Sequence, residues 1–136
     1  RREKKMGMWK EFKLSTNTVE VNGIHISHVK IDGYLDSGTF PRLQDYLTQL
    51  IDAGNYNYIL DLGGLDYISS AGLGVLIGML REVKTNNGDL KIINMSDKIK
   101  RIFNLLGFSK LIRVYDDKEA ALADFKASAA AEQSKS

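Results

Sequence analysis

Apolar residues recur along the chain with two different spacings, and each spacing predicts a different kind of secondary-structure element. Short apolar or alternating runs bounded by turn residues are typical of strands. Asn22-Gly23 is a strong hairpin signal, so the segments on either side of it are expected to pair as antiparallel strands. The predicted strands are residues 24–31, 58–62, 90–94 and 111–115; residues 16–20 are expected to be a strand or a turn, and residues 8–14 fit an edge strand.

Between these runs, apolar residues three and four positions apart predict amphipathic helices. Thr39, with Pro41 in the following turn, and Ser96 are suited to begin helices. Gly54 and Gly107 are suited to end them, because glycine readily adopts the backbone conformation that follows a helix. The predicted helices are residues 39–53, 70–86, 96–107 and 116–125.

Strands and helices alternate from Ile24 onward, and this order predicts an α/β fold. Strands joined through a helix are expected to be parallel, with right-handed crossovers. We therefore expect one domain at residues 9–127, with a mixed, mostly parallel sheet of about five strands, an N-terminal hairpin and about four helices. Residues 1–8 and 128–136 are expected to be disordered or frayed ends.

Composition and charge fit a globular protein that does not bind nucleic acid as its main partner. The chain is 43% hydrophobic and 26% charged, which is ordinary for such proteins. Its net charge of +2 is unevenly spread, because residues 1–5 carry +3 and the remainder sums to −1. A nucleic-acid-binding domain would instead gather lysine and arginine on a folded face.

Cysteine and long apolar runs are both missing from the sequence. With no cysteine, disulfides and thiolate metal sites are excluded. No apolar run approaches the roughly 18 residues that a membrane span needs. The N-terminus lacks the apolar core of a secretory signal, so we expect a cytoplasmic protein with no membrane span.

The segment 61–80 holds the most distinctive chemistry of the chain. An apolar strand is followed by a glycine pair and then by what we expect to be a short turn that presents Ser69 and Ser70. A glycine-rich helix begins immediately behind these serines. The N-terminus of a helix has unpaired N–H groups and favours negative charge. A phosphoryl group on either serine would therefore be tolerated there, although one serine could simply cap the helix.

This segment resembles several enzyme motifs but lacks at least one required residue of each. A nucleophile elbow centred on Ser70 would need glycine where Ile68 stands, and no histidine follows it in the chain. Gly72 and Gly74 fit the start of a dinucleotide fingerprint, but Gly78 comes one residue too late. The lysine of a phosphate-binding loop is absent. We therefore expect no catalytic residue, no cofactor and no enzymatic activity.

Histidines and aspartates elsewhere give no sign of a metal site. His25 and His28 have no suitably spaced carboxylates around them, which favours surface or packing roles. Asp36, Asp61 and Asp66 lack a positioned second group, which favours capping and loop roles. No metal-ligating residue is predicted.

The three glycines of the helix after Ser70 leave two interpretations open. Each costs roughly 0.5–1 kcal/mol relative to alanine in a helix interior, so their presence needs a reason. Gly72, Gly74 and Gly78 could allow close packing on a neighbouring element. They could equally form a flat surface that a partner approaches, and both could be true.

Three segments carry motifs that occur together in one family. Residues 33–41 read GYLDSGTFP, residues 60–76 contain LDL and ISSAGLGVL, and residues 105–120 contain LLGF, Ile112 and Glu119-Ala120. Together they resemble the STAS domain, the domain of sulphate transporters and anti-sigma factor antagonists. The resemblance extends over roughly residues 12–125.

This resemblance implies partner switching as an anti-sigma factor antagonist in bacteria. In such proteins the unphosphorylated domain binds an anti-sigma factor that has an ATP-binding kinase fold and is also a serine kinase. Phosphorylation of a serine in a D-S-[ST]-G-L-G loop releases the domain, and a serine phosphatase restores it. Aligned on Gly72-Leu73-Gly74, the usual aspartate falls on Ser69, the usual serine on Ser70 and the next acceptor on Ala71.

Ser70 is thus the predicted phosphorylation site, with Ser69 as second choice. Because Ser69 replaces the family's aspartate, Asp36 or Asp66 is expected to orient the hydroxyl group. The predicted partner-binding residues are Gly33, Asp36, Thr39, Asp66, Ser69, Ser70, Gly72, Leu73, Gly74 and Gly78.

Two other functions stay open at this point. A STAS domain can serve only for assembly, for example in a signalling or lipid-transport complex, with its serines merely capping the helix. A small enzyme is the third possibility, and the missing histidine base and phosphate loop argue against it.

Overall fold

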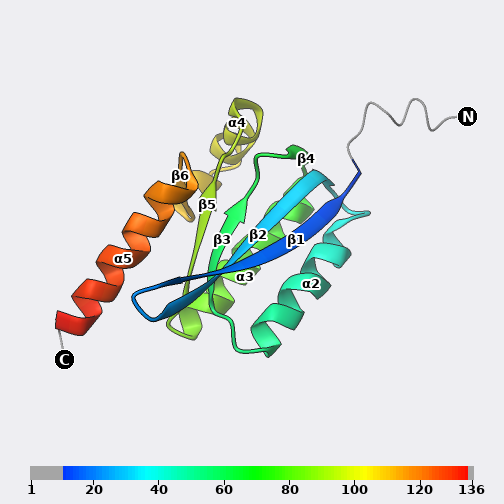
Figure 1. The fold of residues 1–136 in the computed structure, drawn as a ribbon. Coiled ribbons are helices and arrows are strands. Elements are labelled where there is room, and N and C mark those ends of the chain that lie inside the picture. Colours follow the sequence, from blue (N-terminus) through cyan, green and yellow to red (C-terminus); the bar gives the residue numbers. More distant parts are fainter. Residues whose placement is uncertain (1–10, 135–136) are drawn as a thin grey trace, which may run out of the picture.

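The protein is a six-stranded mixed sheet with helices on both faces. The computed structural model describes residues 11–134, with side chains up to Ala129. The main sheet has the order β1-β2-β3-β5-β6, and β4 pairs with the end of β2. Its elements are β1 (Lys13–Val21), β2 (Ile24–Leu35), α2 (Phe40–Asp52), β3 (Asn57–Asp61), β4 (Leu65–Ile68), α3 (Ser70–Thr85), β5 (Asp89–Ile93), α4 (Asp97–Leu105), the short 3₁₀ helix η1 (Phe108–Lys110), β6 (Arg113–Tyr115) and α5 (Lys118–Ser134) (Figure 1).

The predicted α/β architecture is confirmed. The strands β1 and β2 form the antiparallel hairpin around Asn22-Gly23, and every other strand pair in the described residues is parallel. Both turn residues have positive φ angles, 50° and 85°, as the asparagine–glycine pair predicts. Four α-helices connect the strands or follow them in the described chain.

Two segments differ from the sequence-based prediction. Residues 65–68, expected to be a turn, form the strand β4, which pairs with residues 33–35 of β2. The first part of β2 (residues 27–30) pairs with β3 and its end (residues 33–35) pairs with β4, with a register shift in the β4 pairing between Gly33 and Tyr34. The last helix, expected to end at Phe125, continues to Ser134 because an alanine-rich stretch has high helix propensity. Residues 1–8, predicted to be disordered, lie outside the described part.

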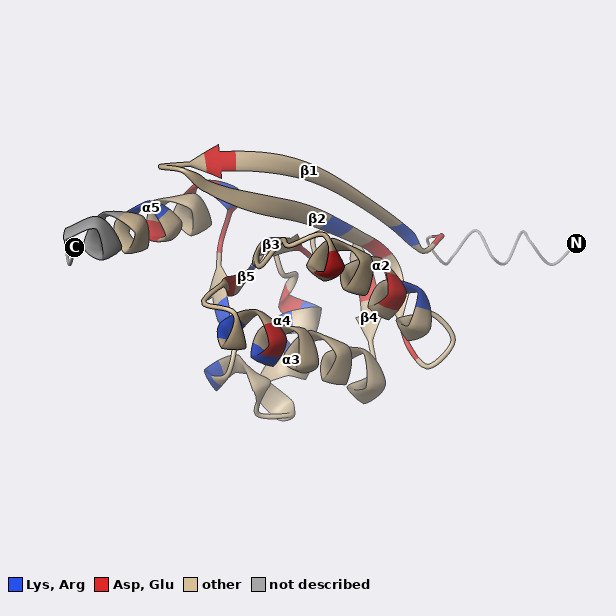
Figure 2. Ribbon diagram, turned by 90° about the horizontal axis from the view of Figure 1, so that it is seen from below, with Lys and Arg blue, Asp and Glu red and all other residues tan. Residues whose placement is uncertain are grey.

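Each buried strand contributes side chains to two cores, because successive residues of a strand point to opposite faces. Tyr58 and Leu60 of β3 belong to the larger core, which α2, α3 and α4 complete. Ile59, between them, belongs to a smaller core that Ala121 and Phe125 of α5 close. Figure 2 shows α2 and α3 together beneath the sheet, with α5 at one end of the molecule.

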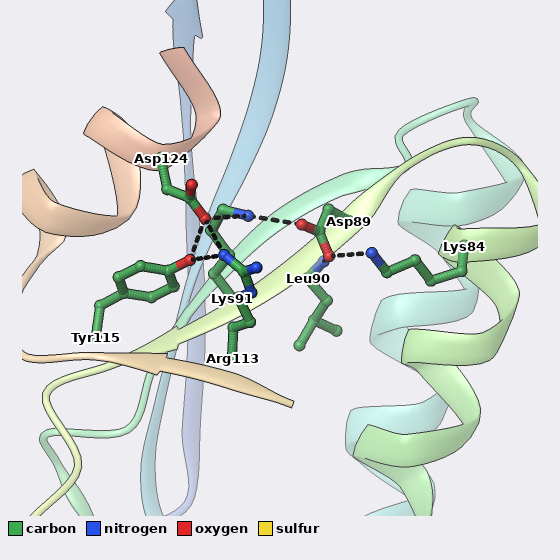
Figure 3. A network of polar contacts seen from close by, with 7 residues as sticks. All are labelled: Lys84, Asp89, Leu90, Lys91, Arg113, Tyr115 and Asp124. Carbon is green, nitrogen blue, oxygen red and sulfur yellow. Dashed lines mark hydrogen bonds and ion pairs between the residues drawn. The ribbon is translucent and has the colours of Figure 1, made fainter. Parts of the chain in front are cut away.

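The buried side chain of Lys91 helps to hold α5 against the sheet face that carries the smaller core. The side chain of Lys91 in β5 is 1% exposed, and its Nζ lies 2.6 Å from Asp89 Oδ2 and 3.3 Å from Asp124 Oδ2 (Figure 3). The ammonium group also lies 4.3 Å from the ring centroid of Phe125. Because a charge is costly to bury without partners, these contacts make the docking of α5 depend on a polar network.

Candidate functional site

The two serines lie at the joint between β4 and α3, and the structure gives them different roles. Ser69 is the N-cap residue of α3, and its Oγ accepts a hydrogen bond from Gly72 N at 3.2 Å. Its backbone N–H donates to the carbonyl oxygen of Leu35 at 2.8 Å, which ties the joint to the end of β2. The hydroxyl group of Ser69 is thus already used in capping the helix.

Ser70, the first residue of α3, is exposed. Its hydroxyl group has no hydrogen-bond partner among residues 11–134. The first turn of α3 contains no acidic residue, so the positive end of the helix dipole is not compensated there. A negatively charged group attached to Ser70 would therefore meet a favourable local potential.

The loop between β2 and α2 lies next to the joint, and its polar side chains hold its shape. Asp36 Oδ1 accepts hydrogen bonds from Gly38 N at 2.9 Å and Thr39 N at 3.2 Å. The Thr39 hydroxyl accepts from Asp36 N at 3.0 Å and donates to the carbonyl oxygen of Tyr34 at 2.9 Å. Thr39 is the N-cap residue by position, as predicted, but its hydroxyl serves the loop and makes no capping bond.

Gly72 and Gly33 are present because other groups approach their backbones closely. A Cβ atom on Gly72 would lie 2.7 Å from Leu35 Cγ and 3.0 Å from the Leu35 carbonyl oxygen. Gly33 has a φ of 99°, and a Cβ atom there would lie 2.7 Å from the carbonyl oxygen of Glu11. Both residues are buried, as is Leu73, so all three support the surface from beneath.

Gly74 and Gly78 have the opposite environment. A Cβ atom on either would meet nothing within 4 Å, and both residues are exposed. With Gln44 and Thr48 of α2 they line a groove of about 220 Å³ between α2 and α3. Gly72 therefore serves close packing, whereas Gly74 and Gly78 leave the surface open, and the approach of a partner to this surface stays a prediction.

A residue that the sequence analysis missed stands beside the joint. Tyr67 of β4 is 42% exposed, and with Asp36, Asp66 and Lys98 it lines an open depression of about 710 Å³. Because residues 65–68 were expected to be a turn, the exposure of the Tyr67 side chain was not predicted. It follows from the position of Tyr67 in the strand. No periodic signal marked this strand, because the buried residues Leu65 and Ile68 are three positions apart and strand side chains alternate every two.

The structure therefore brings Asp36, Asp66, Ser69 and Ser70 to one edge of the sheet, at the C-terminal ends of β2 and β4. Gly74 and Gly78 lie further along α3 on the groove that it forms with α2. None of the helices in residues 11–134 is long and apolar enough to cross a membrane.

Comparison with known proteins places these features in a family. The family model described as the STAS domain matches residues 15–121. The anti-sigma-B factor antagonist of Staphylococcus aureus is 34% identical over 91 residues, which are 67% of this chain and 84% of that protein.

Solved structures agree on the fold. An anti-sigma factor antagonist from Mycobacterium paratuberculosis superposes with a TM-score of 0.69 at 20% identity, over 82% of this chain and 93% of that one. The antagonist SpoIIAA in its unphosphorylated form gives 0.62 at 19% identity, over 82% of this chain and 96% of that one. SpoIIAA of Bacillus in the phosphorylated form also superposes with a TM-score of 0.62 at 19% identity, over 82% of this chain and 97% of that one. The family match over most of the chain and the shared fold lead to one conclusion: this protein belongs to the STAS domain family.

Proposed function

We propose that this protein is an anti-sigma factor antagonist that works by phosphorylation-dependent partner switching. The names of the Staphylococcus aureus relative and of the structural neighbours support the antagonist role. The exposed, unbonded hydroxyl group of Ser70 is the single observation that carries the switching part of the proposal.

In this proposal the unphosphorylated protein binds an anti-sigma factor with an ATP-binding kinase fold. That partner transfers the γ-phosphoryl group of ATP to Ser70 Oγ. The bond from the γ-phosphorus to the bridging oxygen breaks, ADP leaves, and the hydroxyl proton passes to a base of the kinase. A serine phosphatase later hydrolyses the phosphate ester. The STAS protein is the substrate of both steps and is not itself an enzyme.

Ser70 is favoured over Ser69 because their hydroxyl groups differ in availability. Phosphorylation of Ser69 would place a bulky group on the half-buried oxygen that caps Gly72 N, whereas the exposed Ser70 hydroxyl has no such bond to disturb. Capping substitutions of serine cost typically about 1 kcal/mol. Modification at Ser70 can therefore change the surface while the fold stays intact.

The release step would be electrostatic and local. A phosphoryl group adds about −1.5 to −2 charge at pH 7. Asp36 and Asp66 stand at the same edge of the sheet with Lys98 as the basic residue of the depression, so the added charge makes this edge more acidic. A partner that fits the uncharged edge would then be repelled. Tyr67 and the groove at Gly74 and Gly78 would supply the remaining contact surface.

The test compares Ser70→Asp with Ser70→Ala, using an anti-sigma factor with a kinase fold from the same organism as the partner. Ser70→Asp should weaken binding at least tenfold while the melting temperature stays within a few degrees, because the substitution lies on the exposed first turn. Ser70→Ala should bind like the wild type. Incubation with ATP and the partner should place a phosphate on Ser70, as read by mass spectrometry.

Unchanged binding by Ser70→Asp, together with no phosphate on either serine, would instead support a STAS module used only for assembly. Phosphate found on Ser69 would keep partner switching and move its acceptor to the capping position.

A further inference from the structure

A groove beside β6 lies apart from Ser70 and is not used by the proposed function. It has a volume of about 700 Å³ and is formed by α3, β5, α4, η1 and β6. We name it the β6 groove. Its apolar lining comes from Leu80, Met95, Leu111 and Val114. β6 is the last strand of the sheet, on the side away from β1, and among the described strands it pairs with β5 alone (Figure 1).

Apolar side chains at this end of the molecule are unusually exposed. Leu105, Leu106 and Leu111 are 79%, 49% and 55% exposed. These leucines lie on the two sides of Gly107, whose φ of 77° ends α4 and turns the chain into η1. Exposed apolar side chains close to an apolar groove are typical of a surface that binds a partner.

The charge around the β6 groove is positive and partly uncompensated. Residues 97–113 carry a net charge of +4, whereas the rest of the chain sums to −2. Lys84 and Arg113 are paired, with Asp89 at 3.1 Å and Asp124 at 2.9 Å. Lys100 and Lys110, also in the lining, have no such partner in the described chain. The lining as a whole holds four basic side chains against the carboxylates of Asp89 and Asp116, so the groove carries a net charge of +2 beside its apolar side chains.

We propose that the β6 groove binds an acidic, amphipathic segment of a partner protein. The apolar side chains of such a segment would lie on Leu80, Met95 and Val114, and its carboxylates would pair with Lys100 and Lys110. The concave shape favours a peptide segment over a lipid surface, because a bilayer cannot enter a groove. This proposal does not use Ser70 and stands independently of partner switching.

The experiment titrates the full-length, isotope-labelled protein with defined probes and follows backbone amide shifts by NMR. The first probe is a peptide of about 16 residues with leucines at helical spacing on one face and glutamates on the other. The second has every glutamate replaced by lysine, and the third is a vesicle of phosphatidylglycerol. We expect the acidic peptide to bind at least tenfold more tightly than the basic one, with shifts confined to the groove.

Variants separate the site from general charge effects. The double variant Lys100→Glu/Lys110→Glu should bind the acidic peptide at least tenfold more weakly than the wild type. The matched control Lys13→Glu/Lys126→Glu changes the net charge equally at exposed positions away from the groove and should bind normally. Ser70→Asp should also bind normally, which separates this site from the switching surface.

Three results would each overturn the proposal: no saturable binding of the acidic peptide at millimolar concentration, equal binding of both peptides, or shifts that map outside the groove. Binding of the vesicle without binding of the acidic peptide would overturn it in favour of a membrane surface.

Discussion

At the scale of single residues, two glycines in one turn of α3 show how neighbouring positions can have opposite requirements. Gly72 is enclosed by Leu35, and Gly74 faces open space. A helix interior disfavours both equally through backbone entropy. Their different surroundings therefore decide what each substitution does.

We predict that Gly72→Ala destabilises the protein by about 1–3 kcal/mol, because a Cβ atom 3.0 Å from the Leu35 carbonyl oxygen forces the helix and strand apart. Gly74→Ala should leave stability unchanged or raise it by up to about 1 kcal/mol, since it removes only backbone freedom. Urea unfolding of both variants checks this, with Gly78→Ala as a second open position. Equal effects at Gly72 and Gly74 would contradict the packing explanation.

At the scale of elements, α5 is attached by one small apolar core and one polar network. Tyr115 and Arg113 of β6 also bond to Asp124, so the network joins β5, β6 and α5 (Figure 3). The hydrogen bond from Tyr115 is the largest influence that lowers the pKa of Asp124. Burial alone would raise the pKa of Asp89, but hydrogen bonds and charge from Lys91 and Lys84 outweigh it and lower that pKa.

We predict that Asp124→Asn destabilises the protein by about 1–3 kcal/mol, because it leaves buried Lys91 with a single carboxylate partner. Lys91→Met should cost less, since an apolar side chain of similar length needs no partner. Urea unfolding ranks the two variants, and hydrogen exchange should show earlier opening of α5 in Asp124→Asn. A larger loss from Lys91→Met would mean that the ammonium group itself stabilises the fold.

At the scale of the whole molecule, burial of titratable groups links stability to pH. His28 of β2 is largely buried, and neither ring nitrogen has a hydrogen-bond partner among the described residues. Burial is the main cause that lowers its pKa, and Lys118 and Lys30 add to this while Asp61, with Oδ2 at 3.9 Å from Nε2, opposes it. The folded state therefore resists protonation of His28 more than the unfolded chain does.

The sign of the resulting pH dependence follows from this difference. Below a pH of about 6.5 the unfolded chain takes up a proton that folded His28 does not, so stability falls as the pH falls. Asp89 and Asp124, whose pKa values are lowered in the fold, add a further loss below a pH of about 4. We predict that the melting temperature drops by a few degrees between pH 7 and pH 5.

A matched pair of variants assigns this loss to one side chain. His28→Gln should reduce the change in melting temperature between pH 7 and pH 5, because glutamine does not titrate. His25→Gln, at an exposed position of the same strand, should leave it unchanged. A slope that persists in His28→Gln would show that another group is responsible.

The sequence by itself determined the order of the four helices and of every strand except β4, and the place of the serine joint. The Asn22-Gly23 turn, the cap at Ser96 and the glycine after α2 are local signals, because each depends on the conformational preference of one or two residues. The motifs at residues 33–41 and 68–76 likewise indicate the STAS family through short runs of neighbouring residues.

Only the tertiary structure decided what depends on residues far apart in the chain. Residues 65–68 are a strand because the end of β2 offers them a partner, which no local pattern reveals. The same contact ties Ser69 to Leu35 and leaves the Ser70 hydroxyl free, so the two serines became distinguishable only in the fold. Lys91 is buried because two carboxylates, one of them 33 positions later, converge on it. Pairing and burial of this kind are properties of the folded chain, and periodicity along the sequence does not encode them.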